Sequence, residues 1–193
     1  IEQNFYLELT EKQNNEYQDV FKDRDLKNPL EVVTELKKIC NFSSDGSSAK
    51  LSRLKDIAEE LESKDEKMLV FSQYVKSLER VKDSLNIDNV YFYHGGLKKV
   101  EKDNVLNSFK NHDGHAILLI SLGAGAVGLN LQEASTVVLF DRWWNPAIEN
   151  QAIARAHRMG RNEPVHAIKF ITSGTIEDKI DQILQDKSDL FDD

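Results

Sequence analysis

The chain has 193 residues, a formal net charge of −8 and a single cysteine. This length can bury one good core, and the lone cysteine excludes a disulfide framework or a cysteine metal cluster within the chain. No apolar run is long enough to span a bilayer and no secretory signal is present. We therefore expect an intracellular protein, located in the cytoplasm or nucleoid of a prokaryote or in the nucleus of a eukaryote.

The negative charge is unevenly distributed along the chain. Residues 1–66 carry a net charge of −6 and residues 174–193 carry −5, whereas residues 67–173 carry +3. We interpret the two acidic ends as solvated helix surface. The mildly basic middle permits contact with DNA without requiring it.

The first 47 residues differ in pattern from the rest. Residues 5–9 alternate like a strand, a polar helix follows through about Phe21, and residues 29–41 form a short helix. A Ser- and Gly-rich loop at 43–48 then marks a boundary. We expect residues 1–47 to be a linking segment, with residues 1–42 packed beside the main sheet as helices, and residues 48–193 to form the main lobe.

From Lys67 onward, apolar runs alternate with amphipathic stretches, which is typical of a parallel α/β sheet. The predicted fold is α/β, with a mostly parallel sheet of five or six strands and helices on both faces, preceded by a short helical segment. The unbroken apolar run that ends at Phe140 predicts a strand inside the sheet. The expected strands are 67–71, 89–93, 116–121, 136–141 and 165–171, and the expected helices are 50–63, 74–85, 98–110, 146–159 and a last one after Thr175.

Most of the unusual residues follow directly after the expected strands. Ligands of open α/β sheets bind outside the carboxyl ends of the strands, so these residues should meet at one edge. The sequences in question are Ser72-Gln73, His94-Gly95-Gly96, Ser121 to Gly128, and Asp141 to Asn145.

The last expected crossover helix has clear start and stop signals. Asn145 can cap it, Pro146 suits its first position, and Gly160 can end it. Gln151, Arg155 and Arg158 are spaced by four and then three residues, so they share one helix face. Two guanidinium groups there could bind phosphate oxygens, or they could simply pair with carboxylates on a solvated surface.

Gly123 to Gly128 reads as G-x-G-x-x-G directly after a strand. A dinucleotide-binding site would need a full crossover helix and an acidic residue about 20 positions later. Here the next strand begins at Thr136, and Asp141 stands only 13 residues after Gly128. The dinucleotide interpretation is therefore the least favoured alternative.

Asp141-Arg142-Trp143-Trp144-Asn145-Pro146 and the run from Gln151 to Gly160 closely resemble the fifth and sixth conserved motifs of Swi/Snf-type DNA-translocating ATPases of helicase superfamily two. The run from Leu36 to Asn41 is similar to the segment between the two lobes of that family. Residues 121–131 resemble a family loop that touches the DNA backbone and the lobe interface, although Leu122-Gly123 replaces its usual Thr-Lys/Arg pair. The chain thus resembles the C-terminal RecA-like lobe, preceded by the tail of the first lobe.

This resemblance implies that Arg155 and Arg158 act as arginine fingers in an ATP hydrolase. ATP and Mg²⁺ would be bound mainly by the first lobe, because this chain has no P-loop and no acidic Mg²⁺ box. No metal site is expected, and the chain alone should be inactive. The implied contacts with ATP and the lobe interface are Gln151, Gly128, Asn130 and Asp141. The implied DNA contacts are Gln73, His94, Gly95, Gly96, Lys98, Lys99, Lys102, Ser121, Ala124 and Gly125.

The expected partners are double-stranded DNA, the first lobe of the same parent chain and possible protein targets along the DNA, with no membrane. Three alternatives stay open. His94 could belong to a simple tight turn instead of a DNA contact. Trp143 and Trp144 could stack on bases, but packing under the neighbouring helix is favoured. The whole lobe could also be a non-catalytic interaction module.

Overall fold

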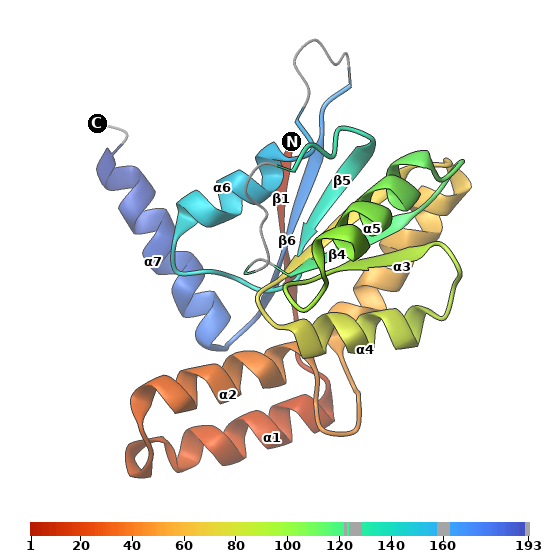
Figure 1. The fold of residues 1–193 in the computed structure, drawn as a ribbon. Helices are drawn as coiled ribbons and strands as arrows, with labels where there is room; N and C mark the ends of the chain where they lie inside the picture. Colours follow the sequence, from red (N-terminus) through yellow and green to blue (C-terminus); the bar gives the residue numbers. More distant parts are fainter. Residues whose placement is uncertain (122, 124–128, 158–162, 192–193) are drawn as a thin grey trace.

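The computed structural model describes residues 1–121, 123, 129–157 and 163–191. Its centre is a parallel sheet with the strand order β1-β6-β5-β2-β4-β3 (Figure 1). The predicted α/β fold is confirmed, and β5 lies inside the sheet as expected. The strands are β1 (Glu2–Leu7), β2 (Lys67–Ser72), β3 (Val90–Tyr93), β4 (Ile117–Ser121), β5 (Ala134–Leu139) and β6 (His166–Thr172).

Helices cover both faces of the sheet, and local capping signals determine where several of them begin. Thr10, Asn28, Ser48 and Asn145 each accept a hydrogen bond from a backbone N–H of the following turn, as N-cap residues do. No described helix is long and apolar enough to cross a membrane. The helices are α1 (Glu11–Lys22), the 3₁₀ turn η1 (Arg24–Leu26), α2 (Pro29–Asn41), α3 (Ala49–Ser63), α4 (Val75–Leu85), α5 (Lys99–Asn111), α6 (Pro146–Ala154) and α7 (Ile176–Phe191).

The two faces of the sheet bury two separate clusters, because side chains alternate along each strand. On β2, Met68 and Val70 pack with α3 and α4, whereas Leu69 and Phe71 face the side of α5 and α6. All four side chains have no exposed surface. The apolar runs therefore show no polar alternation, as expected for strands covered on both faces.

The N-terminal strand corrects one prediction. Residues 1–42 do not pack beside the sheet only as helices, because β1 is an edge strand that pairs in parallel with β6. Phe5 stacks on Phe170 with ring centroids 6.3 Å apart. The alternation at residues 5–9 did indicate a strand, but its partner lies more than 160 residues away. The domain boundary after residue 47 stays a prediction.

Helix α6 is shorter than predicted. It ends at Ala154 instead of continuing to residue 159, and Arg155 is its C-cap. The carbonyl of Arg155 accepts a hydrogen bond from the backbone N–H of Leu131, at 2.9 Å. The end of α6 is therefore bonded to the loop before β5. The predicted positions of Arg158 and Gly160 lie outside the described residues.

The α1–α2 hairpin projects beyond the carboxyl ends of the strands (Figure 1). Its small apolar cluster is formed by Tyr17, Val32, Leu36 and Cys40. The end of α2 returns to the sheet, where Phe42 stacks on Phe140 at 5.9 Å. The N-terminal segment is therefore joined to the main lobe through both a strand and a buried helix end.

Candidate functional site

The loops after β2, β3, β4 and β5 meet at one edge of the sheet, since these strands are parallel neighbours. Ser72 and Ser121 stand opposite each other at the ends of β2 and β4, and Tyr93 pairs with Ile120. The backbone N–H of Phe140 donates to the carbonyl of Phe71, at 2.9 Å, beyond the last strand residue of β5. This edge is where ligands of such sheets bind.

Asp141 holds two of these loops together. Its carboxylate is fully buried and accepts hydrogen bonds from Asn41 Nδ2 at 3.0 Å, from the Gln73 backbone N–H at 3.2 Å and from the Ser72 hydroxyl. Gln73 in turn donates from Nε2 to the carbonyl of Arg142, at 3.3 Å. With three protein donors bound to its carboxylate, Asp141 joins the loop after β5 to the end of β2 and to the end of α2.

Arg155 presents its guanidinium at the end of α6. Its side chain is partly exposed, and Nε donates to the carbonyl of Gln151 at 3.2 Å. No carboxylate of the described residues forms an ion pair with it, so the surface salt-bridge alternative finds no support at this position. Gln151 itself is exposed on α6. The other predicted arginine, Arg158, lies outside the described residues.

The His94 segment forms a tight turn. His94 Nδ1 accepts a hydrogen bond from the backbone N–H of Gly96 at 3.1 Å, and its ring lies 4.6 Å from the Phe92 ring. A Cβ atom on Gly96 would approach the His94 ring to 3.1 Å, which explains why glycine suits that position. Gly95 and Gly96 are exposed, so the turn remains open to a ligand.

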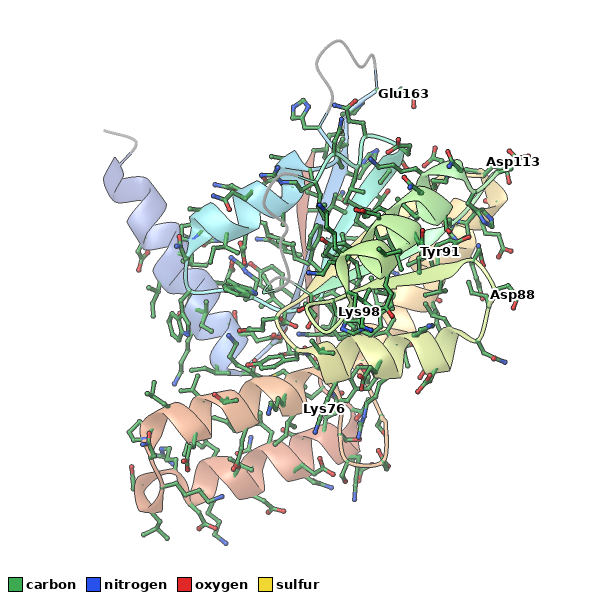
Figure 2. All side chains as sticks on the ribbon, viewed as in Figure 1. Lys76, Asp88, Tyr91, Lys98, Asp113 and Glu163 are labelled. Atoms are coloured by element: carbon green, nitrogen blue, oxygen red, sulfur yellow. The ribbon has the colours of Figure 1, made fainter. Side chains whose placement is uncertain are left out.

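The lysines after this turn carry charges without ion-pair partners among the described residues. Lys98 (Figure 2) and Lys99 are exposed at the start of α5. Lys102 is half-buried, with Nζ 5.6 Å from the centroid of the Tyr93 ring. Ser121 is buried and Asn130 is exposed. Gly128, Ala124 and Gly125 were also predicted to belong to the site, and they lie outside the described residues.

Sequence reasoning missed a buried ionic cluster behind this edge. Lys50 Nζ donates to Glu177 Oε2 at 2.6 Å and to Asn41 Oδ1 at 2.8 Å, and both charged side chains are fully buried. Asn41 in turn donates a hydrogen bond from Nδ2 to Asp141, which connects the buried ion pair to the site. Lys50 shares helical spacing with Leu54, Ile57 and Leu61, so its place in an apolar stripe was the available signal.

A second cluster fixes the loop after β5 to two helices. Arg142 is 3% exposed, and it bonds through Nε to Glu149 Oε1 at 2.8 Å and through Nη1 to Asp181. Glu149 also accepts from the Trp143 backbone N–H at 3.2 Å. Because Glu177 and Asp181 are buried, the interpretation of the acidic C-terminal region as solvated surface is wrong for these two residues.

The two tryptophans have different surroundings. Trp143 is half-buried, and its indole nitrogen is buried without a hydrogen-bond partner among the described residues. Trp144 is exposed beside it. The structure is therefore consistent with packing for Trp143 and leaves the Trp144 ring free to contact another surface.

Burial shifts the pKa values of several groups beneath the site. It lowers the pKa of the Lys37 ammonium, although the nearby carboxylates of Asp141 and Glu177 oppose this shift. It also raises the pKa of the Cys40 thiol to about 12. In the part of the chain that the structure describes, no three His, Cys, Asp or Glu side chains gather as possible metal ligands.

Comparisons with known proteins agree on this architecture. The family model for the helicase conserved C-terminal domain matches residues 49–160. The DNA repair protein RAD5 of Cryptococcus neoformans is 37% identical over 172 residues, which cover 88% of this chain and 14% of that protein. The chain spans a fifth or less of the length of the curated relatives it matches.

Two solved structures from Sulfolobus solfataricus are similar over the whole chain. The SWI2/SNF2 ATPase C-terminal domain is 32% identical with a TM-score of 0.78, and the match covers 100% of this chain and 88% of that one. The SWI2/SNF2 ATPase core in complex with double-stranded DNA is 31% identical with a TM-score of 0.78, covering 99% of this chain and 45% of that one.

Proposed function

Because the chain belongs to the helicase conserved C-terminal domain family, as the C-terminal lobe of a Snf2-type helicase, we propose that it is the second motor lobe of an ATP-dependent DNA translocase. In this proposal a first lobe binds ATP and Mg²⁺. The present lobe supplies positive charge to the nucleotide and contacts with the DNA backbone. The two lobes move along the duplex as they close and open around the nucleotide.

The observation that carries this proposal is the partly exposed guanidinium of Arg155 at the end of α6, which forms no ion pair with a carboxylate of the described residues. Phosphoryl transfer needs positive charge where negative charge develops on the transferring phosphate, and a guanidinium supplied from another lobe can provide it. The planar donor fork of arginine also matches the geometry of phosphate oxygens. We propose that Arg155 and Arg158 act together as arginine fingers, with Gln151 coupling nucleotide to the lobe contact.

The buried clusters support this role by fixing the position of α6. Arg142 joins the loop before α6 to Glu149 within it and to Asp181 on α7. Asp141 ties the same loop to Ser72 and to the start of α4. A catalytic group must be held close to its working geometry, because a displacement of about 1 Å can cost roughly a hundredfold in rate.

We propose that double-stranded DNA crosses the neighbouring part of the same edge. Lys98 and Lys99 are exposed there and form no ion pair with a carboxylate of the described residues, and Gly95 is exposed in the His94 turn, where the Gly96 N–H is bound by the His94 ring. Contacts from lysines and backbone amides to phosphates carry affinity but no sequence information, which suits a protein that moves along DNA. The solved relative in complex with double-stranded DNA makes such a ligand reasonable for this chain.

The direct test compares ATP hydrolysis by the chain alone with hydrolysis by the full protein that includes a first lobe. We expect no turnover above background from the chain alone, since a phosphate cradle and Mg²⁺ ligands are also required. The full protein should hydrolyse ATP faster when duplex DNA is added. Turnover by the chain alone, or no stimulation of the full protein by DNA, would contradict the proposal.

A further inference from the structure

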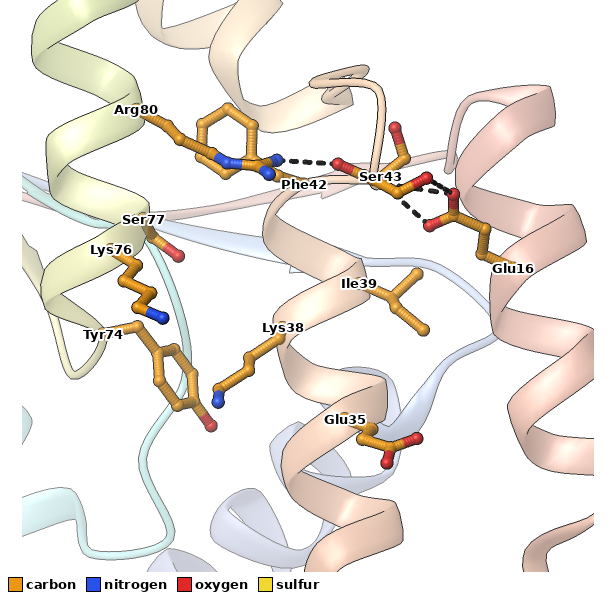
Figure 3. A pocket seen from close by; sticks show the side chains of 11 residues that line it. Glu16, Glu35, Lys38, Ile39, Phe42, Ser43, Tyr74, Lys76, Ser77 and Arg80 are labelled. Carbon is orange, nitrogen blue, oxygen red and sulfur yellow. Dashed lines mark hydrogen bonds between the residues drawn. The ribbon is translucent and has the colours of Figure 1, made fainter.

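A pocket lies between the α1–α2 hairpin and the first turns of α4 (Figure 3). Its volume is 360 Å³, which is within the size range of small ligand pockets. Ile39, Phe42 and Tyr74 supply apolar surface to it. The pocket could therefore hold one apolar side chain and the backbone next to it.

Three cations line this pocket. Lys38 and Lys76 point into it from α2 and α4, and Arg80 lies farther along α4 (Figure 3). Arg80 is held in place, because Nη1 donates to the Ser43 carbonyl at 2.7 Å and the guanidinium lies 5.6 Å from the Phe42 ring centroid. None of the three forms an ion pair with a carboxylate of the described residues.

The two carboxylates that line the pocket are already engaged. Glu16 accepts hydrogen bonds from the backbone N–H of Ser44, at 3.0 and 3.1 Å. Glu35 pairs with Lys27 at 3.6 Å. With three cations against two carboxylates, the pocket lining carries excess positive charge, although the whole chain carries a net charge of −8.

Tyr74 adds a neutral donor between the lysines. Burial raises the pKa of its hydroxyl, so the group stays protonated and able to donate throughout the physiological range. Its hydroxyl has no hydrogen-bond partner among the described residues, and Lys38 Nζ lies 5.8 Å from its ring centroid. Ammonium and hydroxyl donors around an apolar floor suit a carboxylate ligand that also carries an apolar group.

We propose that this pocket binds an acidic segment of a partner protein. One aliphatic or aromatic side chain of that segment would rest on Ile39, Phe42 and Tyr74, while its carboxylates pair with Lys38 and Lys76. Charge complementarity selects the acidic partner, and the apolar floor distinguishes it from DNA, whose phosphates would leave that floor unfilled. The proposal is independent of ATP turnover and of the role of Arg155.

The test measures binding of short fluorescein-labelled peptides to the chain by fluorescence anisotropy. The first peptide is rich in Asp and Glu with a central Leu-Phe pair. The second replaces Leu-Phe by Ser-Ser, and the third replaces each acidic residue by its amide. A labelled DNA duplex of equal charge serves as the competing ligand. Only the first peptide should bind well, with at least about a tenfold advantage over the others.

The pocket variant is Lys38→Glu with Lys76→Glu, and its matched control is Lys55→Glu with Lys82→Glu, which makes the same change in charge at exposed positions. The pocket variant should bind the first peptide at least about tenfold more weakly than the wild-type chain does, and the control variant less than about twofold more weakly. A lysine-rich peptide with the same Leu-Phe pair should gain affinity for the pocket variant. If circular dichroism shows that the pocket variant has lost structure, the variant Lys38→Gln with Lys76→Gln takes its place in the same measurements.

Three results would overturn the proposal. The first is equal binding of the acidic peptide to the wild-type chain and the pocket variant. The second is equal binding of the peptides with and without Leu-Phe. The third is failure of the acidic peptide to bind up to about 1 mM, with or without a loss of duplex binding in the pocket variant. Loss of duplex binding would assign these lysines to DNA.

Discussion

Lys50 and Lys98 belong to two regions near the carboxyl edge of the sheet that use charge differently. Lys50 is fully buried and bonded to Glu177 and Asn41, within a cluster that reaches Asp141. Lys98 is exposed at the start of α5, and its ammonium group forms no ion pair with a carboxylate of the described residues. Charge in the first region is bound within the protein, whereas charge in the second is available to a ligand.

The comparison shows what each region can contribute. A buried ion pair has a fixed geometry but adds little net stability, because desolvation offsets the attraction between its charges. Removing only one partner is strongly destabilising, because the other charge is left buried and uncompensated. An exposed lysine keeps its charge without a desolvation cost and can pair with the phosphate of a ligand. We infer that the buried region sets the shape of the edge, and that the exposed charges and the Arg155 guanidinium act on ligands.

The largest expected effect follows from removing one partner of the buried pair. Lys50→Ala should lower the free energy of unfolding by about 3–5 kcal/mol, because the Glu177 carboxylate would remain buried without its cation. Urea denaturation measures this loss. The matched change Lys55→Ala on the exposed side of α3 should stay within about 0.5 kcal/mol. A loss at Lys50 as small as that at Lys55 would remove the distinction between the two regions.

A double substitution sharpens the same comparison. Lys50→Met with Glu177→Leu removes both charges, so it should cost clearly less than Lys50→Ala in the same urea experiment. If the double variant lost as much stability as the single variant, the effect would reflect packing and not an uncompensated charge.

A smaller effect concerns Cys40, which lies beneath the buried cluster. Burial raises the pKa of its thiol from the ordinary 9.0 to about 12, so stability from the neutral thiol is complete below pH 9 and is lost as the pH rises toward 12. From about pH 8 to about pH 10 the wild-type chain should lose about 1.4 kcal/mol more than Cys40→Ala. Parallel pH profiles for the two proteins in urea denaturation would contradict this.

The smallest expected effect is on DNA affinity. Lys98→Glu with Lys99→Glu in the full protein should weaken duplex binding roughly threefold to tenfold at physiological salt and flatten its salt dependence, lowering the slope of log affinity against log salt by roughly two. Titrations at several salt concentrations measure both. Lys55→Glu with Lys82→Glu is the charge-matched control. An unchanged slope in the Lys98 and Lys99 variant would place the DNA path elsewhere.

The sequence predicted the sheet well because its strands are unbroken apolar runs, and it predicted the start of α6 because Asn145 and Pro146 act locally. It did not predict that β1 joins the sheet, since its partner β6 is distant along the chain. It also did not predict that α6 ends at Ala154, because the hydrogen bond from Leu131 that accompanies this end is tertiary. Local patterns do not contain these long-range contacts.

The site was predicted in part for the same reasons. Parallel neighbouring strands bring Ser72, Ser121 and Asp141 to one edge, which follows from topology alone. The roles of Glu177 and Asp181 were missed, because an acidic helix end normally faces solvent and only the fold places these carboxylates against Lys50 and Arg142. Which charged side chains are buried depends on how the helices and strands pack together, and amino-acid composition does not predict this packing.

Arg155 is the residue on which the proposed function depends most, so the decisive measurement is DNA-stimulated ATP turnover by the full protein. The variants are Arg155→Ala, Arg155→Lys and the control Arg53→Ala. Arg53 pairs with Asp56 at 3.9 Å and its guanidinium lies 4.7 Å from the centroid of the Phe5 ring, so its charge already has partners within the chain. Arg155→Ala should reduce turnover by at least about a hundredfold, since supplied arginine fingers contribute roughly 10³–10⁵ in rate.

Arg155→Lys should rescue turnover poorly, because lysine keeps the charge but loses the planar fork. Arg53→Ala should keep near-normal turnover, and all three variants should melt within a few degrees of the wild type. If Arg155→Ala instead retained near-normal turnover, Arg155 would be a surface residue and the arginine-finger assignment would be wrong.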